Sequence, residues 1–200
     1  MARNDAARKA DIAQDTKETR TRIALNLDGK GVSTVNTGIG YFDHMLEQFA
    51  FHGLFDLKVT CKGDLKVDSH HTVEDVGLAL GKAIDKALGD RSRIRRFSHC
   101  YYPMDETLVR AVMDLSGRPE FHFQGEFRYA KVGALDSHMI PHFFKSLAIT
   151  ARLTLHLAIL YGENDHHKCE GLFKAFTRAL RDAVARDPRR GGVVSTKGIL

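Results

Sequence analysis

The segment HHTVEDVGLALGKAIDKAL at residues 70–88 decides the fold, because its opening phrase HHTVE returns as HHKCE at residues 166–170. After each phrase, apolar residues recur at three- and four-residue steps, the period of an amphipathic helix. In such a helix the glutamate lies four residues after the first histidine and three after the second, spacings that bring side chains together. Adjacent histidines point about 100° apart on a helix, so each pair can serve two neighbouring ions. The repetition predicts a duplicated metal-ligand set.

The repeat extends beyond these two phrases. The stretch LNLDGKG at residues 25–31 is matched by MDLSGRP at 113–119, and HMLEQFAFHGLFDLKV at 44–59 is matched by HFFKSLAITARLTLHL at 142–157. The first pair is typical of a strand entering a glycine turn, and the second of a helix followed by a strand. We therefore predict an α+β fold of two similar halves from an internal duplication, each a small, mainly antiparallel sheet with two helices. The expected strands include residues 21–27, 54–61, 107–115 and 120–127.

The repeat also sets the expected boundaries. The first α+β half is predicted over residues 16–95 and the second over residues 96–190. Charge spread through residues 1–15, without an apolar core, predicts a disordered N-terminal extension. Residues 191–200 open on two glycines and are expected to form a flexible C-terminal segment.

The composition indicates an ordinary globular protein: of 200 residues, 43% are hydrophobic and 28% are charged. No apolar stretch approaches the ~20 residues that a membrane span needs, and the charged first residues do not resemble a signal peptide. Three cysteines without a CxxC pair favour a reducing compartment, so we expect a cytoplasmic protein. The net charge of +5 suggests an anionic partner. The basic clusters lack interleaved aromatic residues, which favours a solvated surface over nucleic-acid binding.

Histidines at matched positions of the repeat are the candidate metal ligands. Two imidazole-rich sets, each with one carboxylate, suit manganese, iron, zinc or nickel better than calcium or magnesium. Three imidazoles and one carboxylate per ion would leave open positions, which indicates catalysis rather than a purely structural role. The eight predicted ligands are His44, His70, His71, Glu74, His142, His166, His167 and Glu170.

A second set of residues is typical of an anion site. Arg96 precedes an expected strand, Arg118 follows a glycine at the end of another, and the phrase STKG at residues 195–198 offers a hydroxyl, backbone amides and an ammonium group. Guanidinium and hydroxyl groups of this kind suit a phosphate monoester.

Several motifs together resemble the imidazoleglycerol-phosphate dehydratase family. They are GIGYFDHML at 38–46, DSHHTVEDVGLALG at 68–81, RFSHCYYPMDETL at 96–108, DLSGRP at 114–119, PHFFKSLA at 141–148, NDHHKCEGLFKAFTRALRDA at 164–183 and STKG at 195–198. The resemblance covers roughly residues 16–198. The paired His-His phrases and PMDE are its most specific parts, and the length matches the monofunctional form.

The resemblance implies a manganese enzyme of histidine biosynthesis that removes water from imidazole glycerol phosphate to give imidazole acetol phosphate. It implies halves that fold like the second domain of ribosomal protein S5, and a homo-oligomer of 24 subunits with active sites between subunits. The family's ligand set falls on the eight residues named above, with two Mn²⁺ ions per active site. Its substrate contacts fall on Glu18, Gln48, His52, Arg96, Arg118, Lys174, Ser195 and Lys197, with residues 191–200 closing over the substrate.

The implied reaction explains why two ions are needed. The proton to be removed sits on a hydroxyl-bearing carbon without an adjacent carbonyl, so the substrate imidazole, bound by two metal ions as imidazolate, would serve as the electron sink. Candidate proton-transfer residues are Glu18, Glu74 and Glu170, with Glu18 favoured for the carbon-bound proton. Two alternatives stay open at this point. One is a two-metal phosphoesterase, and the other is a non-catalytic oligomer stapled by metal.

Overall fold

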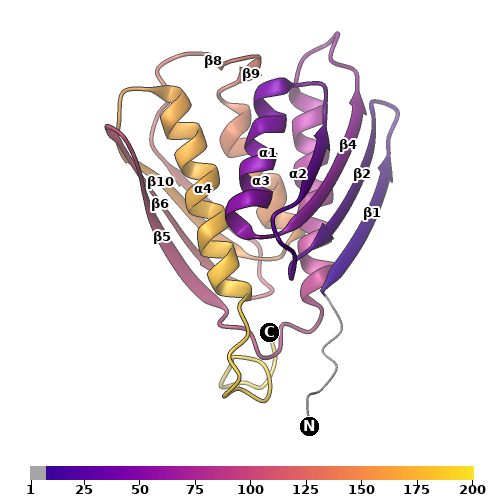
Figure 1. Ribbon diagram of the computed structural model, residues 1–200, viewed down its shortest axis with the longest axis vertical. Helices are drawn as coiled ribbons and strands as arrows, with labels where there is room; N and C mark the ends of the chain where they lie inside the picture. Colours follow the sequence, from indigo (N-terminus) through magenta and orange to yellow (C-terminus); the bar gives the residue numbers. More distant parts are fainter. Residues whose placement is uncertain (1–7) are drawn as a thin grey trace.

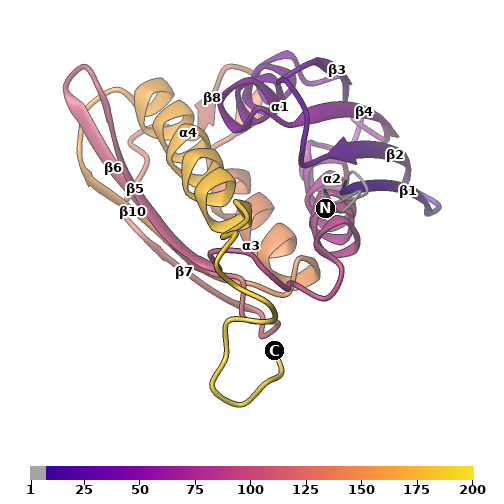
Figure 2. The ribbon, with the colours of Figure 1, turned by 60° about the horizontal axis from the view of Figure 1, so that its bottom comes forward.

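Alternating burial along β2 (Thr19–Asn26) and β6 (Thr107–Asp114) defines the inner faces of two sheets. In each strand every second side chain is buried, while its neighbours face outward. The computed structural model describes residues 8–200. In this part of the chain the helices lie between the two sheets, whose inner faces they cover (Figure 1 and Figure 2). The outer faces stay polar or partly exposed, as expected of antiparallel sheets covered on one side.

The two sheets share one topology. The first has the order β1 (Lys9–Asp15), β2, β4 (Asp56–Gly63), β3 (Ser33–Asn36), and only β3 and β4 run parallel. The second has the order β5 (Phe97–Met104), β6, β10 (Thr154–Tyr161), β7 (Glu120–Gln124), and only β7 and β10 run parallel. The predicted α+β duplication is confirmed.

The helices pair across the two halves. The first half supplies α1 (Gly40–Gly53) and α2 (His70–Leu88), and the second supplies α3 (Met139–Thr150) and α4 (Asp165–Val184). Helix α2 packs against α3, and α1 packs against α4. Phe42 and Phe143 meet edge to face at the centre, with ring centroids 5.3 Å apart. The two halves therefore share one core, and the N-terminal ends of all four helices lie at the same end of the molecule (Figure 1).

A glycine lets α2 and α3 approach closely. A Cβ atom at Gly81 would lie 2.1 Å from Thr150 Oγ1 and 2.4 Å from the carbonyl oxygen of Leu147. Only the absence of a side chain permits this contact, since distances under 3.0 Å force the neighbours to shift. This contact lies at the last turn of α3. Nearer the histidines, a Cβ atom at Gly77 would lie 2.9 Å from the carbonyl oxygen of Phe143, so the two helices also pack closely beside His142.

The second half contains an extra hairpin, made of β8 (Lys131–Val132) and β9 (Leu135–Asp136). It lies in the connection between β7 and α3, whereas residues 37–39 alone join β3 to α1 in the first half. The duplication therefore does not predict this hairpin. It lies beside the N-terminal ends of the helices, at the top of Figure 1.

The structure corrects the expected N-terminal boundary. The prediction that residues 1–15 are disordered is wrong for residues 9–15, which form β1 and pair with β2 from Lys9↔Asn26 to Asp15↔Arg20. The strand lies at the edge of the sheet, and Ala10 is buried. An edge strand can be largely polar and still form regular backbone pairing with its neighbour. Residues 1–7 lie outside the described part. Within residues 8–200, every helix is too short or too polar to cross a bilayer.

Candidate active site

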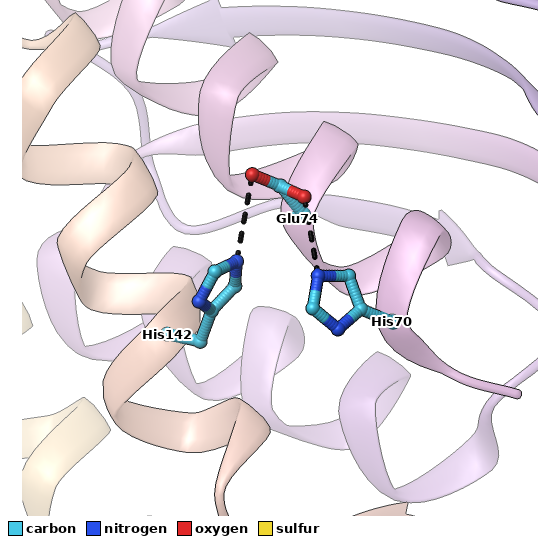
Figure 3. A group of neighbouring side chains, drawn as sticks. All are labelled: His70, Glu74 and His142. Atoms are coloured by element: carbon cyan, nitrogen blue, oxygen red, sulfur yellow. Dashed lines mark ion pairs between the residues drawn. The ribbon is translucent and has the colours of Figure 1, made fainter.

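His70, Glu74 and His142 form one candidate metal group where the first turns of α2 and α3 meet (Figure 3). His70 Nε2 lies 3.3 Å from Glu74 Oε2, and His142 Nε2 lies 3.5 Å from Glu74 Oε1. The two imidazole rings are 4.8 Å apart between centroids. His142 Nε2 is buried, and among residues 8–200 no group hydrogen-bonds to it. A buried polar atom without a partner is costly, so this nitrogen is suited to a ligand from outside the chain.

His44, His166 and Glu170 form a matching group between α1 and α4. His166 Nε2 lies 3.0 Å from Glu170 Oε2, and His44 Nε2 lies 3.6 Å from the same oxygen. The other carboxylate oxygen of Glu170 accepts a hydrogen bond from Lys174 Nζ at 2.6 Å. Burial opposes ionisation of this carboxyl group, but the hydrogen bond and charge of Lys174, together with His166 and His44, outweigh it and lower the pKa of Glu170. Glu170 is therefore a charged ligand at neutral pH.

The donor types in both groups suit a divalent transition metal, and in the group of His70, Glu74 and His142 the three donor atoms lie within 4.8 Å of one another. Each group offers two imidazole nitrogens and one carboxylate, a set that suits manganese, iron, zinc or nickel. A structural zinc site would be closed by four protein ligands, whereas each group here supplies three side chains of one chain. Coordination positions are thus left for further ligands. Six of the eight predicted ligands lie in these two groups.

The remaining two predicted ligands, His71 and His167, lie outside both groups and pair with other carboxylates. His71 Nδ1 is 3.0 Å from Asp64 Oδ2, just after β4, and His167 Nδ1 is 2.7 Å from Glu106 Oε2, in the turn between β5 and β6. Metal-binding histidines commonly give one ring nitrogen to a carboxylate in this way, which orients the ring and leaves the other nitrogen for a metal. The two histidines are equivalent in the duplication, but their carboxylate partners are not, because Asp64 follows β4 whereas Glu106 lies in the β5–β6 turn, the counterpart of the β1–β2 turn.

Hydrogen bonds within these pairs shift the pKa of Glu106 and of His71. Hydrogen bonds from the backbone of Asn164, from His167 and from Thr107 lower the pKa of Glu106 well below its ordinary value. The hydrogen bond to Asp64 raises the pKa of His71 above its ordinary value. An anionic partner accepts the Nδ1–H of each histidine, so Nε2 is the nitrogen that faces outward from the pair.

Glu18 lies beside His71. Its Oε1 atom is 3.7 Å from His71 Nε2, the nitrogen that does not contact Asp64. Glu18 and Asp64 line the same open groove of about 540 Å³, together with Lys62. Of the three candidate proton-transfer residues, Glu18 is thus the one outside the two metal groups, while Glu74 and Glu170 lie within them.

Gln48, His52 and Lys174 lie on the facing surfaces of α1 and α4. His52 Nε2 is 3.1 Å from Gln48 Oε1, one helical turn apart on α1. Burial, together with the nearby positive charge of Lys174, lowers the pKa of His52, so this imidazole is neutral at pH 7. Lys174 reaches from Glu170 toward the ring of Tyr102, with Nζ 5.6 Å from the ring centroid.

The four predicted anion-binding residues line one groove of about 660 Å³. The guanidinium group of Arg96 donates to both carboxylate oxygens of Asp114 at 2.7 and 3.0 Å, and also to the carbonyl of Val194. This contact holds the C-terminal segment against the groove. The other three residues that line it are Arg118, Ser195 and Lys197.

The groove and the metal groups lie at opposite ends of α4. The backbone N–H of Arg96 donates to the carbonyl of Ala183, in the last turn of the helix, whereas His166 lies in its first turn. A helix of 20 residues is roughly 30 Å long at 1.5 Å per residue. One small substrate therefore does not reach both regions of the same chain.

Sequence reasoning missed the carboxylates that orient the outer histidines. Asp64 follows a strand and has no signal of its own in the sequence. Glu106 belongs to PMDE, a phrase that the resemblance singled out without a role for its acids. Tyr41 was also missed; its hydroxyl donates to the carbonyl of His166 at 3.3 Å.

Comparison with known proteins places this geometry in a family. The family described as imidazoleglycerol-phosphate dehydratase matches residues 37–180. The imidazoleglycerol-phosphate dehydratase of Methylobacillus flagellatus is 52% identical over 196 residues, covering 98% of this chain and 99% of the relative. That of Exiguobacterium sp. is 54% identical over 191 residues, covering 96% of this chain and 97% of the relative.

Solved structures agree with the sequence comparison. The crystal structure of imidazoleglycerol-phosphate dehydratase from Staphylococcus aureus has a TM-score of 0.82 and 36% identity, covering 90% of this chain and 99% of that one. The structure from Pyrococcus furiosus has a TM-score of 0.81 and 33% identity, covering 94% of this chain and 100% of that one. A duplicated α+β fold shared with dehydratases, together with a candidate His–Glu metal group in this chain, defines a metal-dependent hydro-lyase. The chain belongs to the imidazoleglycerol-phosphate dehydratase family, which serves histidine biosynthesis.

Proposed function

We propose that the chain dehydrates imidazole glycerol phosphate to imidazole acetol phosphate, with the substrate imidazole held as imidazolate between two metal ions. The observation that carries this proposal is the matched pair of groups, His70, Glu74 and His142 on one side and His44, His166 and Glu170 on the other. Each of the two nitrogens of an imidazolate ring would bind one metal ion. A duplicated ligand set supplies two equivalent sites for these ions.

The metal in this proposal is Mn²⁺, two ions per active site, which suits mixed imidazole and carboxylate ligands. When bound, the ions would act as Lewis acids on both ring nitrogens and make the ring an electron sink for loss of the neighbouring hydroxyl group. The side chains of the two groups would hold the ions, and Glu74 and Glu170 each lie beside two imidazoles, which fixes the relative orientation of the rings.

His71 and His167 would complete the ligand sets of neighbouring chains. Each has one ring nitrogen fixed by a carboxylate, and each lies outside the groups of its own chain. Three imidazoles and one carboxylate per ion then arise only in an assembly. This supports a homo-oligomer with active sites between subunits, and we propose the family's 24-subunit form.

The phosphate would bind in the groove of Arg96, Arg118, Ser195 and Lys197. Because this groove lies at the far end of α4 from the metal groups of its own chain, it would serve a site whose metal ligands come from another subunit. Residues 191–200 would close over the substrate, since Val194 already contacts Arg96. Phosphate binding would then position the flexible glycerol chain.

We assign the carbon-bound proton to Glu18. Its carboxylate lies 3.7 Å from the outward-facing nitrogen of His71, so it would stand beside the ring that this histidine helps to hold. Gln48, His52 and Lys174 would contact the substrate from the surface between α1 and α4. A cytoplasmic location stays a prediction.

One assay tests the proposal. Protein loaded with Mn²⁺ is incubated with imidazole glycerol phosphate, and the enolisable ketone product is followed by its ultraviolet absorbance in alkali. Product formation that needs added metal supports the assignment. Release of inorganic phosphate without ketone would instead support a phosphoesterase, and binding of metal without turnover would support a metal-stapled oligomer.

A further inference from the structure

The connection between β7 and α3, residues 125–138, touches the first turn of every helix that carries a metal ligand. We call it the brace. It contains the β8–β9 hairpin, which lies at the N-terminal ends of the helices in Figure 1. It exists only in the second half of the duplication, so the first half does not explain its presence. Its contacts with the helices include a side-chain hydrogen bond, a buried ion pair and close packing of backbone.

The brace joins α2 to α3 through Ser69 and Asp136. The Ser69 hydroxyl donates to Asp136 Oδ2 at 2.9 Å. Ser69 precedes α2 directly, at the position where a serine normally caps its own helix, yet its side chain makes no such cap. The carboxylate of Asp68 accepts the N–H of His70 instead, at 2.7 Å. The Ser69 hydroxyl therefore binds Asp136, three residues before the start of α3, and does not cap α2.

The brace holds α4 through a buried ion pair. The backbone N–H of Tyr129 donates to Asp165 Oδ2 at 2.7 Å. Lys168 Nζ lies 2.8 Å from Asp165 Oδ1 and also donates to the carbonyl of Glu126 at 3.2 Å. Asp165 and Lys168 are both buried and flank His166 and His167 in the sequence. Two points of the brace are therefore fixed to the turn that carries these histidines.

The contact with α1 uses the turn of the hairpin. Gly133 has φ of +60°, as the first position of a tight hairpin turn requires. A Cβ atom there would lie 3.0 Å from Tyr41 Cβ, so the backbone of the turn packs directly on α1. Tyr41 in turn donates to the carbonyl of His166. The turn therefore supports the helix pair that carries His44 and His166.

The brace is itself held rigidly. Val132, Leu135 and Ser137 are buried. The Ser137 hydroxyl donates to the carbonyl of Tyr129 at 2.7 Å, and its backbone N–H donates to the carbonyl of Ala130 at 2.8 Å. The residues before and after the hairpin are thereby hydrogen-bonded to each other, so the contacts of the brace belong to one connected unit.

We propose that the brace is a positioning element for the metal site, with Ser69 and Asp136 as its positioning residues. It holds the first turns of four helices in the arrangement in which both metal groups can bind their ions. This inference rests on the proposed two-metal function. It also explains why the connection is longer in one half than in the other. A single brace already contacts both helix pairs, so a second copy in the first half would have no helix ends left to hold.

The test compares Ser69→Ala and Asp136→Ala with the wild type. Mn²⁺ alone is titrated into metal-free protein by calorimetry. Loss of a residue that orients metal ligands weakens metal affinity by about 10- to 100-fold, and we expect the lower end of this range for both variants. In the metal-free protein, amide hydrogen exchange should also become faster in the first turns of α3 and α4, not only beside residue 69.

Two matched variants separate positioning from general packing. Lys131→Ala removes the other partner of Asp136, which lies 3.4 Å away within the hairpin, and should keep wild-type affinity. Ser69→Thr retains the hydroxyl and should keep it as well. Unchanged Mn²⁺ affinity and unchanged exchange at α3 and α4 in the alanine variants would overturn the proposal, even if they melt at a lower temperature. A wild type that binds no Mn²⁺ would refute the proposed function, while the exchange data would still decide whether the brace couples the helices.

Discussion

Replacement of Glu18 by glutamine keeps the size of the side chain and removes its ability to take a proton. Glu18 lies outside both metal groups, 3.7 Å from His71 Nε2, so the metal content of Glu18→Gln should stay at the wild-type level. Loss of a general acid–base group lowers turnover by about 10²- to 10⁴-fold, and we expect a decrease in this range. Steady-state kinetics and metal analysis measure the two quantities on the same preparation.

The control for this substitution is Glu120→Gln. Glu120 is exposed on the outer face of the second sheet and contacts only His122 among the described ion pairs, at 3.6 Å. Turnover of this control should match the wild type. If Glu18→Gln also retained full turnover, the proton would have to be assigned to another carboxylate.

Lys197 tests the phosphate groove at the residue scale. A hydrogen bond to a charged group contributes about 1.5–3 kcal/mol, which corresponds to roughly a 10- to 100-fold change in affinity. We expect Lys197→Ala to raise KM by this factor with a smaller change in kcat, because the ammonium group would bind phosphate rather than the reacting carbon. Arg189→Ala is the matched control, since Arg189 is exposed, pairs with Asp187 and does not line the groove. Equal KM values for the two variants would contradict the assignment.

The ends of α2 and α3 opposite the metal group are joined by a buried arginine. Arg91 is 2% exposed, and its guanidinium group donates to Asp85 Oδ1 at 2.5 Å and to the carbonyls of Ala151 and Arg152 at 2.8 Å. These carbonyls lie just past the end of α3, where a helix leaves acceptors without partners. Asp85 is 26% exposed and keeps its ion pair with Arg152, so no charge is left buried and unpaired. Hydrogen bonds to a charged group contribute about 1.5–3 kcal/mol, and Arg91→Met should lose free energy of unfolding in this range in denaturant titrations.

Arg152→Met is the control for this element. Arg152 pairs with the same carboxylate, at 3.0 Å, but its side chain is 53% exposed. Exposed ion pairs contribute about 1 kcal/mol or less, so this variant should stay close to the wild type. A similar loss in both variants would mean that Asp85, rather than the buried contacts of Arg91, determines the stability of this helix end.

The sequence predicted those elements whose apolar residues recur with a regular helical or strand period. Helix α2 begins at His70 as expected, because its apolar residues follow one helical face. Strand β1 was missed because only alternate, weakly apolar residues face inward and its stability comes from backbone pairing with β2. The β8–β9 hairpin was missed because the repeat has no copy of it. In each case the missing information lies in contacts with other elements.

The same distinction holds within the candidate site. Spacing predicted that Glu74 and Glu170 would meet both histidines of their phrases. The contact with the first histidine is present in each case, whereas the second histidine pairs with Asp64 or Glu106 instead. The partner from the other half depends on how α2 packs on α3, with Gly77 close to the carbonyl of Phe143, which no spacing reveals. Likewise, Asp64 reaches His71 only because β4 ends beside the first turn of α2.

At the scale of the whole molecule, assembly should depend on metal and on the two outer histidines. The double variant His71→Ala, His167→Ala keeps both groups of its own chain but removes the ligands proposed to reach neighbouring chains. We expect it to lose the large assembly at low protein concentration, as the wild type should after chelation, because a ligand that binds only the assembled state stabilises it by mass action. Light scattering coupled to size exclusion measures the mass.

The matched variant His122→Ala, His156→Ala removes two histidines stacked on the outer sheet face, 4.6 Å apart between centroids, and should respond to metal like the wild type. A metal-free wild type that keeps its full mass on dilution would show that the chains are held together without the shared ions.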